Sequence, residues 1–355
     1  MTVSTLDVDR SISTLRLNSQ EFANLTNEEL SAMFLTSIEN IKTIAYFWAT
    51  IGADNKGIKG STAEGEEWLG GPFASTIALQ YYIDYLKNDI DFIDEKSISE
   101  NKINVFPNKN IEKLLFPYVT ADIHFNKNMS IEDILNARGF GNRLGFKKGI
   151  TLILGAGNVS SIPLLDTIYD MVVNRHCILL KLNPVNEYLK PVFEKVFENF
   201  ISRGFMIVTT GDTEISSYMT NHLGITNMHL TGSDKTYEKI VYGSVLPEKD
   251  KGKKTLTKRN KKPFTTELGN VTPFIIHPGN WSSGEIKYQA RKIVTAKLNN
   301  NGFTLIPLNI HYNKKGFAKV DIGISKGRKK EDKREYKKEQ DWKREKDRLI
   351  SKNIK

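Results

Sequence analysis

Residues 149–184 read GITLILGAGNVSSIPLLDTIYDMVVNRHCILLKLNP, and this stretch decides the fold. An apolar run enters a glycine turn, a segment with helical spacing follows, and a second apolar run begins near Cys177. Apolar strands separated by helical segments are typical of a parallel sheet that helices cover on both faces. The stretch therefore predicts the first strand–helix–strand unit of an α/β fold.

The same alternation continues to residue 279. Each further strand is preceded by a segment with helical spacing, which favours one parallel sheet rather than a set of hairpins. In chain order we expect a helix at 188–204, a strand at 205–212, a helix at 214–224, a strand at 226–233, a helix at 234–245 and strand material at 263–279.

The sequence before this region has a different character. Residues 1–22 are polar, and we expect a flexible N-terminus there. Thr26 and Glu29 form a capping-box pattern ahead of apolar residues at helical spacing, which predicts a helix over 23–52. We further expect a glycine-rich loop at 57–75, a helix at 75–87, and a surface stretch at 88–113 with a short strand near 103–106.

Charge is concentrated near the C-terminal end of the printed sequence. The chain has 355 residues and a net charge of +10, and residues 314–355 hold 17 Lys or Arg against 8 Asp or Glu. A second basic run, at 249–262, is expected to form an exposed loop. Basic segments attract phosphate backbones or anionic lipids, whereas most charge runs are solvated surface, so charge alone does not identify a partner.

The composition excludes several classes of protein. Cys177 is the single cysteine, so an internal disulfide framework and a cysteine-rich zinc site are excluded, and we expect no metal. The first residues lack a signal-peptide pattern, and no apolar run reaches the ~18 residues that cross a bilayer. We therefore expect a cytoplasmic protein without a membrane partner.

Two turns could hold the phosphates of a dinucleotide. Gly155 and Gly157 match two of the three glycines of the dinucleotide fingerprint, but Ser160 stands at the third position. Lys181 stands where an acidic residue would hold a ribose. An ordinary strand-to-helix turn explains this pattern equally well.

The second turn, formed by Thr231, Gly232 and Ser233, follows a strand and opens a helix. The unpaired N–H groups and the positive dipole end of a helix suit a pyrophosphate. A capped helix without a ligand is the alternative for this turn.

Taken in order, six segments resemble the aldehyde dehydrogenase superfamily over residues 23–302. They are LGAGNVSSIP, LLKLNP, IVTTGD, MHLTGS, KPFTTELGNVTP and KIVTAKLNNNG. The resemblance implies a Rossmann-like, parallel-sheet cofactor domain that binds NAD or NADP. It also implies that Asn158 stabilises an oxyanion, Lys181 meets the adenosine ribose or its phosphate, Ser233 meets the pyrophosphate, and Glu267 is the general base.

The nucleophile of that family is missing. Its catalytic cysteine stands three residues after the glycine of the Asn-x-Gly motif, and Gly302 plus three is Leu305. Thr304 is adjacent, but an alcohol needs a strong base, and Cys177 is expected to be a core residue. We therefore predict no turnover. An oxidoreductase that acts on aldehyde or acyl substrates through another nucleophile is the alternative.

From residue 298 to residue 355 the chain resembles another family, the SsrA-binding protein SmpB. The segment KVDIGISKGRKKEDKRE, at 319–335, carries this resemblance. It implies a β-hairpin from a partial OB-like barrel and a basic helical tail, which bind transfer-messenger RNA and the ribosome. The basic residues expected to contact RNA are Lys326, Arg328, Lys329, Lys330, Lys333 and Arg334.

The two resemblances meet near residue 300. The expected organisation is a flexible N-terminus at 1–22, an aldehyde-dehydrogenase-like region at 23–297 and an SmpB-like segment at 298–355. Three interpretations stay open: a fusion of an RNA-binding segment with an incomplete cofactor domain, a nonfunctional chimera, and a working oxidoreductase. Truncation of both parts is expected to expose apolar surface and favour self-association.

Overall fold

The computed structural model describes residues 3–61, 63–87, 102–107, 110–115, 119–125, 147–247, 256–269, 279–301, 303–312 and 318–326. The chain forms two compact units, Met1–Asn270 and Val271–Lys355, and each is considered by itself. Among the described residues, no helix is both long and apolar enough to span a membrane.

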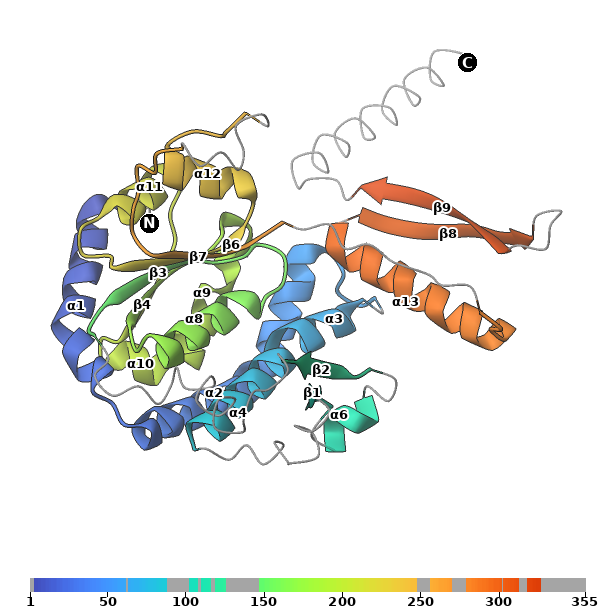
Figure 1. Cartoon of the computed structure of the whole chain (residues 1–355), viewed down its shortest axis with the longest axis horizontal. Coiled ribbons are helices and arrows are strands. Elements are labelled where there is room, and N and C mark those ends of the chain that lie inside the picture. Colours follow the sequence, from blue (N-terminus) through green and yellow to red (C-terminus); the bar gives the residue numbers. More distant parts are fainter. Residues whose placement is uncertain are drawn as a thin grey trace, which may run out of the picture. The chain divides into compact units, whose positions relative to one another are not determined.

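A five-stranded parallel sheet lies at the centre of the N-terminal unit (Figure 1). Its spatial order is β5-β4-β3-β6-β7. From the central strand β3 the chain adds β4 and β5 on one side, and it then crosses back to add β6 and β7 on the other side. The predicted parallel sheet and α/β class are confirmed. The strands are β3 (Ile150–Leu154), β4 (Cys177–Lys181), β5 (Met206–Thr209), β6 (Asn227–Gly232) and β7 (Phe264–Leu268).

Helices cover both faces of this sheet. The crossovers from β3 to β5 place one set of helices on one face, and the helices that flank β6 cover the other face together with α1 (Figure 1). The first set is α8 (Ile162–Val173), η2 (Pro184–Leu189), α9 (Lys190–Val196) and α10 (Glu198–Ser202), and the second is α11 (Thr213–Asn221) and α12 (Asp234–Tyr242). The single helix predicted at 188–204 is broken at Phe197, whose φ of −102° and ψ of 22° lie outside the helical region.

The N-terminal residues form a helix where the sequence led us to expect a flexible segment. Helix α1 (Thr5–Ala23) begins with a capping box between Ser4 and Asp7. Val8, Ile12 and Leu15 are buried on one of its faces, and the helix packs against β3 and β4. The many polar residues between these positions lie on the opposite face, which is why the apolar stripe is easily overlooked.

A second layer of helices packs behind the first. Helix α2 (Asn27–Lys56) starts at the predicted capping box, in which Thr26 Oγ1 accepts from the Glu29 N–H, and ends at Gly57 with a φ of 68°. The stretch expected to be a loop contains two short helices. The remaining described elements of this unit are α3 (Glu64–Trp68), the π-helix η1 (Leu69–Phe73), α4 (Ala74–Leu86), β1 (Lys102–Phe106), α6 (Asn110–Leu115) and β2 (Ala121–His124).

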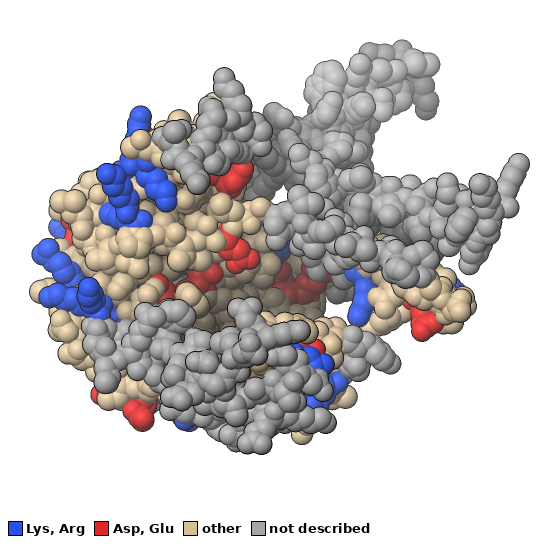
Figure 2. Space-filling view, viewed as in Figure 1, with Lys and Arg blue, Asp and Glu red and all other residues tan. Residues whose placement is uncertain are grey.

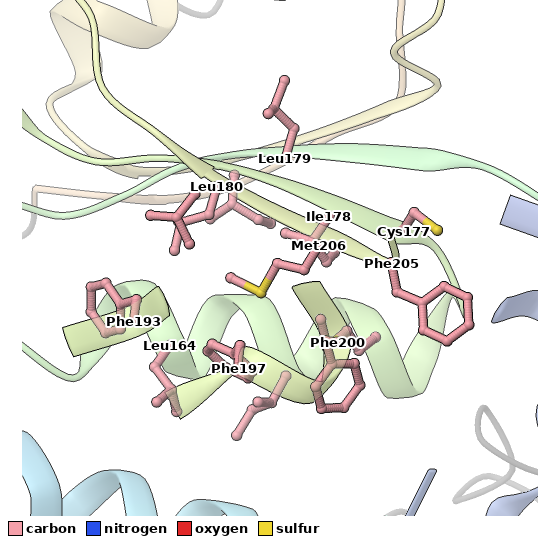
Figure 3. Packing of buried hydrophobic residues seen from close by; sticks show 14 of the residues in the cluster. Leu164, Cys177, Ile178, Leu179, Leu180, Phe193, Phe197, Phe200, Phe205 and Met206 are labelled. Carbon is pink, nitrogen blue, oxygen red and sulfur yellow. The ribbon is translucent and has the colours of Figure 1, made fainter. Parts of the chain in front are cut away.

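The single cysteine is a core residue, as predicted. Cys177 is fully buried at the start of β4 and lies among apolar side chains that include Phe205 (Figure 3). Burial raises the pKa of its thiol to about 12, so almost no thiolate forms near neutral pH. Cys177 is therefore not a nucleophile in the folded protein.

The C-terminal unit contains one described helix and one hairpin. Helix α13 (Ser283–Asn301) is followed by β8 (Phe303–Tyr312), which pairs in antiparallel fashion with β9 (Ala318–Lys326). Leu305 lies opposite Ile324 in this hairpin, which is the hairpin that the sequence predicts. The basic helical tail predicted after Lys326 lies outside the described residues, and the assignment of the hairpin to a partial OB-like barrel stays a prediction.

Candidate functional site

A cleft of about 910 Å³ lies at the carboxyl ends of the parallel strands. Leu154, Lys181 and Leu230, from the ends of β3, β4 and β6, line it together with residues of α11 and α12. The cleft therefore spans the point between β3 and β6 where the strand order reverses. In open α/β sheets this position is the usual place for a bound nucleotide.

The four residues predicted to bind a cofactor all line this cleft. Lys181 ends β4, while Thr231, Gly232 and Ser233 link β6 to α12. Ser233 is the N-cap of α12, and its Oγ accepts from the Thr236 N–H at 3.2 Å. The positive end of the α12 dipole therefore faces the cleft, where it would favour an anionic group.

Lys181 carries its charge in a largely buried position. Only 6% of its surface is exposed, and burial lowers the pKa of its ammonium group. The carboxylates of Glu187 and Asp212 act against this shift, because their negative charges favour the protonated lysine. The two carboxylates thus offset part of the effect of burial on the pKa of Lys181.

Asp212 is a cleft residue that the sequence analysis did not single out. It lies in the short link between β5 and α11, caps the N-terminus of α11 and lines the same cleft as Lys181. Its Oδ1 accepts from the Glu214 and Ile215 N–H groups, each at 3.0 Å. The dinucleotide fingerprint places the acid that holds the ribose at the end of the second strand, which here is β4 and ends in Lys181. An aspartate at the next strand end, in the segment TTGD, was the available signal.

The glycine turn after β3 allows close packing of the backbone. A Cβ at Gly155 would lie 3.2 Å from the Pro163 ring, and a Cβ at Gly157 would lie 3.0 Å from the Asn183 side chain. The Ser161 N–H, at the start of α8, donates to the Gly70 carbonyl of η1 at 3.0 Å. A protein carbonyl therefore occupies this helix start.

The two residues expected to act in catalysis do not line the cleft. Asn158 is exposed, and its backbone carbonyl accepts from Lys56 Nζ at 3.2 Å. Lys56 in turn pairs with the buried carboxylate of Glu67 at 2.5 Å, which fixes the turn against α2. Glu267 is exposed on β7, in register with Thr231. Leu305 lies in the C-terminal unit.

A polar network fixes the end of β6. Thr231 Oγ1 donates to Asp166 Oδ2 of α8 at 2.9 Å. His229 Nε2 lies 3.4 Å from Asp166 Oδ1, and its Nδ1 lies 2.8 Å from Thr265 Oγ1 of β7. These contacts join β6 to a covering helix and to the edge strand, so the backbone that leads to the start of α12 is held firmly.

Most of the predicted RNA-binding residues lie outside the described residues. Lys326 ends β9, opposite Phe303, whereas Arg328, Lys329, Lys330, Lys333 and Arg334 follow it. In the face shown in Figure 2, the basic side chains of the described residues lie in separate groups. Within the described part of the chain, no cluster of His, Cys, Asp and Glu is suited to a metal ion.

Comparison with known proteins relates the C-terminal segment to one family. Residues 286–352 match the family model of the SmpB protein. The SsrA-binding protein of Rhodospirillum rubrum is 29% identical over 153 residues, which are 43% of this chain and 81% of that protein. That of Agrobacterium fabrum is 48% identical over 58 residues, which are 16% of this chain and 36% of that protein.

Solved structures relate the fold to another family. Aldehyde dehydrogenase 21 of Physcomitrella patens matches with a TM-score of 0.51 and 13% identity, over 85% of this chain and 51% of that one. The structure of 3,6-anhydro-L-galactose dehydrogenase in complex with NAP matches with a TM-score of 0.50 and 14% identity, over 84% of this chain and 51% of that one. The chain thus spans about half of each enzyme, and the likeness concerns the fold.

The chain therefore joins a region with an aldehyde dehydrogenase-like fold to a segment similar to SmpB, and both predicted resemblances are confirmed. The SmpB match begins at residue 286, inside α13. The segment KIVTAKLNNNG (292–302), which the sequence analysis attributed to aldehyde dehydrogenases, thus also lies within the range of the SmpB match.

Proposed function

We propose that the C-terminal segment binds transfer-messenger RNA, the SsrA RNA. The observation that carries this proposal is the SmpB match over residues 286–352, supported by relatives that are named SsrA-binding proteins. The basic cluster from Lys326 to Arg334 supplies the charge that RNA phosphates require. Contact with the ribosome through residues 335–355 is part of the same proposal.

Direct RNA binding tests this function. The full chain is titrated against transfer-messenger RNA and against a transfer RNA of similar charge density, with and without alanine at Lys329, Lys330, Lys333 and Arg334. Loss of four phosphate contacts should weaken binding by about 100-fold at low salt. Unchanged affinity, or equal affinity for both RNAs, would contradict the proposal. A matched control removes four exposed charges of the N-terminal unit, at Arg10, Lys42, Lys59 and Lys195.

For the N-terminal unit we propose cofactor binding without turnover. The cleft has a volume of about 910 Å³, within the ~300–1,000 Å³ that is usual for ligand sites. Gly232 and Ser233 would hold the pyrophosphate, and Lys181 would donate to the adenosine ribose. A bound nicotinamide would supply hydride acceptance, but Leu305 at the expected nucleophile position lies in the SmpB-like segment.

The absence of turnover is the distinguishing part of this second proposal. We infer that Asn158 and Glu267 are relics of an oxyanion donor and a general base, because neither residue lines the cleft. A working oxidoreductase and a nonfunctional chimera are the competing interpretations, and self-association is compatible with each. These three interpretations are separated by titrating NAD and NADP with intrinsic fluorescence as the readout and by assaying aldehyde oxidation in parallel. Binding without oxidation supports the proposal, oxidation supports the enzyme, and absence of both RNA and cofactor binding supports the chimera.

A further inference from the structure

Among the described residues, Lys181, Asp212 and Lys239 are the charged residues that line the cleft. Lys181 is the cation at the end of β4, and the carboxylates of Glu187 and Asp212 both act on it. Asp212 lines the cleft itself, one strand further along the sheet than Lys181. A ligand group that contacts Lys181 is therefore also exposed to the negative charge of Asp212. Both residues lie on the same side of the point where the strand order reverses.

The capping hydrogen bonds of Asp212 use one of its two carboxylate oxygens. Both backbone N–H groups that cap α11 donate to its Oδ1. Asp212 is exposed, and within the described part of the chain its Oδ2 accepts no hydrogen bond. An ionised carboxylate accepts hydrogen bonds and donates none, so Oδ2 suits a ribose hydroxyl. It repels a phosphate, which carries about two negative charges near neutral pH.

Resting on the proposed cofactor binding, we infer that Asp212 makes the cleft select NAD over NADP. The ribose 2′-hydroxyl of NAD donates to Asp212 and accepts from Lys181. The positive charge of Lys181 would attract the 2′-phosphate of NADP, but the negative charge of Asp212 would repel it. Glu187, which acts on Lys181, would weaken the attraction. Because Asp212 is exposed, solvent screens its charge, and the repulsion from this one carboxylate corresponds to roughly tenfold in affinity.

The test compares two cofactors on the same full-length protein. NAD and NADP are titrated separately by isothermal calorimetry or intrinsic fluorescence, so the readout does not depend on activity. The wild-type chain should bind NAD roughly tenfold more tightly than NADP. Equal affinities, or tighter binding of NADP, would overturn the role of Asp212. Failure of both cofactors to bind would overturn the proposed cofactor site together with this inference.

Two variants isolate the charge of Asp212. Asp212→Asn keeps a good N-cap for α11 and removes the negative charge, so the preference for NAD should fall to about twofold or less. Glu214→Gln removes the same charge from the first turn of the same helix, at a residue that does not line the cleft, and should leave the preference unchanged. An unchanged preference in folded Asp212→Asn, or an equal loss in Glu214→Gln, would contradict the inference.

Discussion

The two units of this chain resemble known proteins by different criteria, one by amino-acid sequence and the other by fold. The C-terminal segment is related by sequence, with 48% identity over 58 residues to one SsrA-binding protein. The N-terminal unit is related by fold, at 13% identity to a solved aldehyde dehydrogenase. A fold persists when core residues are exchanged for others of similar volume. Phosphate recognition depends on individual charged side chains. The sequence likeness of the C-terminal segment therefore bears directly on a ligand, whereas the likeness of the N-terminal unit concerns the fold.

The largest expected effect concerns the core of the N-terminal unit. Phe200 is fully buried, with its ring centroid 5.5 Å from that of Phe34 and 5.8 Å from that of Phe197. Phe200→Ala should lower the free energy of unfolding by about 3–5 kcal/mol, measured by urea denaturation. Leu17→Ala, at a residue that is 83% exposed, should change it by less than about 0.5 kcal/mol. Equal effects of the two substitutions would contradict the described core.

Thiol labelling tests the same unit by chemistry. Because the pKa of Cys177 is raised to about 12 by burial, the folded protein should react with iodoacetamide about 1,000-fold more slowly than the unfolded protein near pH 8. Cys177 is the single thiol, so the total labelling rate reports on it alone. Fast labelling of the folded chain would show that this region holds an accessible nucleophile after all.

Acid should destabilise the N-terminal unit through His176. Burial lowers the pKa of this histidine, whose Nδ1 lies 3.0 Å from Thr151 Oγ1. A depressed pKa contributes stability that is present above about pH 6.5, the unfolded value, and is lost as the pH falls through the folded value. Nearby Asp170 has a pKa raised by burial, so its own contribution is present at low pH and is lost as the pH rises through its folded pKa.

A variant separates the two contributions. In urea unfolding, the wild-type chain should be less stable at about pH 5.5 than at about pH 7.5. His176→Gln should show a smaller loss, because it removes the group that resists protonation. An identical pH dependence in both proteins would mean that the histidine does not contribute.

The smallest expected effect is on catalysis. Leu305→Cys should leave aldehyde oxidation at background level, because residue 305 lies in the SmpB-like segment and neither Asn158 nor Glu267 lines the cleft. Formation of reduced nicotinamide is measured by absorbance with a panel of aldehydes. Turnover above that of Leu305→Ser would overturn the assignment of the N-terminal unit as catalytically incomplete.

The centre of the sheet was predictable from sequence because β3 and β4 consist mainly of apolar residues. All five residues of β3 and all five of β4 are buried, and such runs leave little doubt about a sheet covered on both faces. Helix α1 was missed because Val8, Ile12 and Leu15 are spaced among polar residues that face away from the core. A stripe of this kind is recognised only when its spacing is counted.

The cleft was only partly predictable. Lys181 and the turn at Thr231–Ser233 lie at strand ends, and parallel strands bring their carboxyl ends to one edge of the sheet. Asp212 shares the cleft with Lys181 because β4 and β5 are neighbours in the sheet, so this acid stands at the end of a different strand from the lysine. The different environments of Asn158 and Glu267 likewise depend on contacts with α2 and on the edge position of β7.

The central claim is that RNA recognition belongs to the C-terminal segment and nucleotide binding to the N-terminal unit. The most direct measurement is the affinity of the full chain for transfer-messenger RNA as a function of salt, with and without saturating NAD. We predict that the logarithm of the binding constant falls linearly with the logarithm of salt concentration, with a slope that reflects about four or more phosphate contacts and does not change with NAD. A flat salt response would contradict the claim.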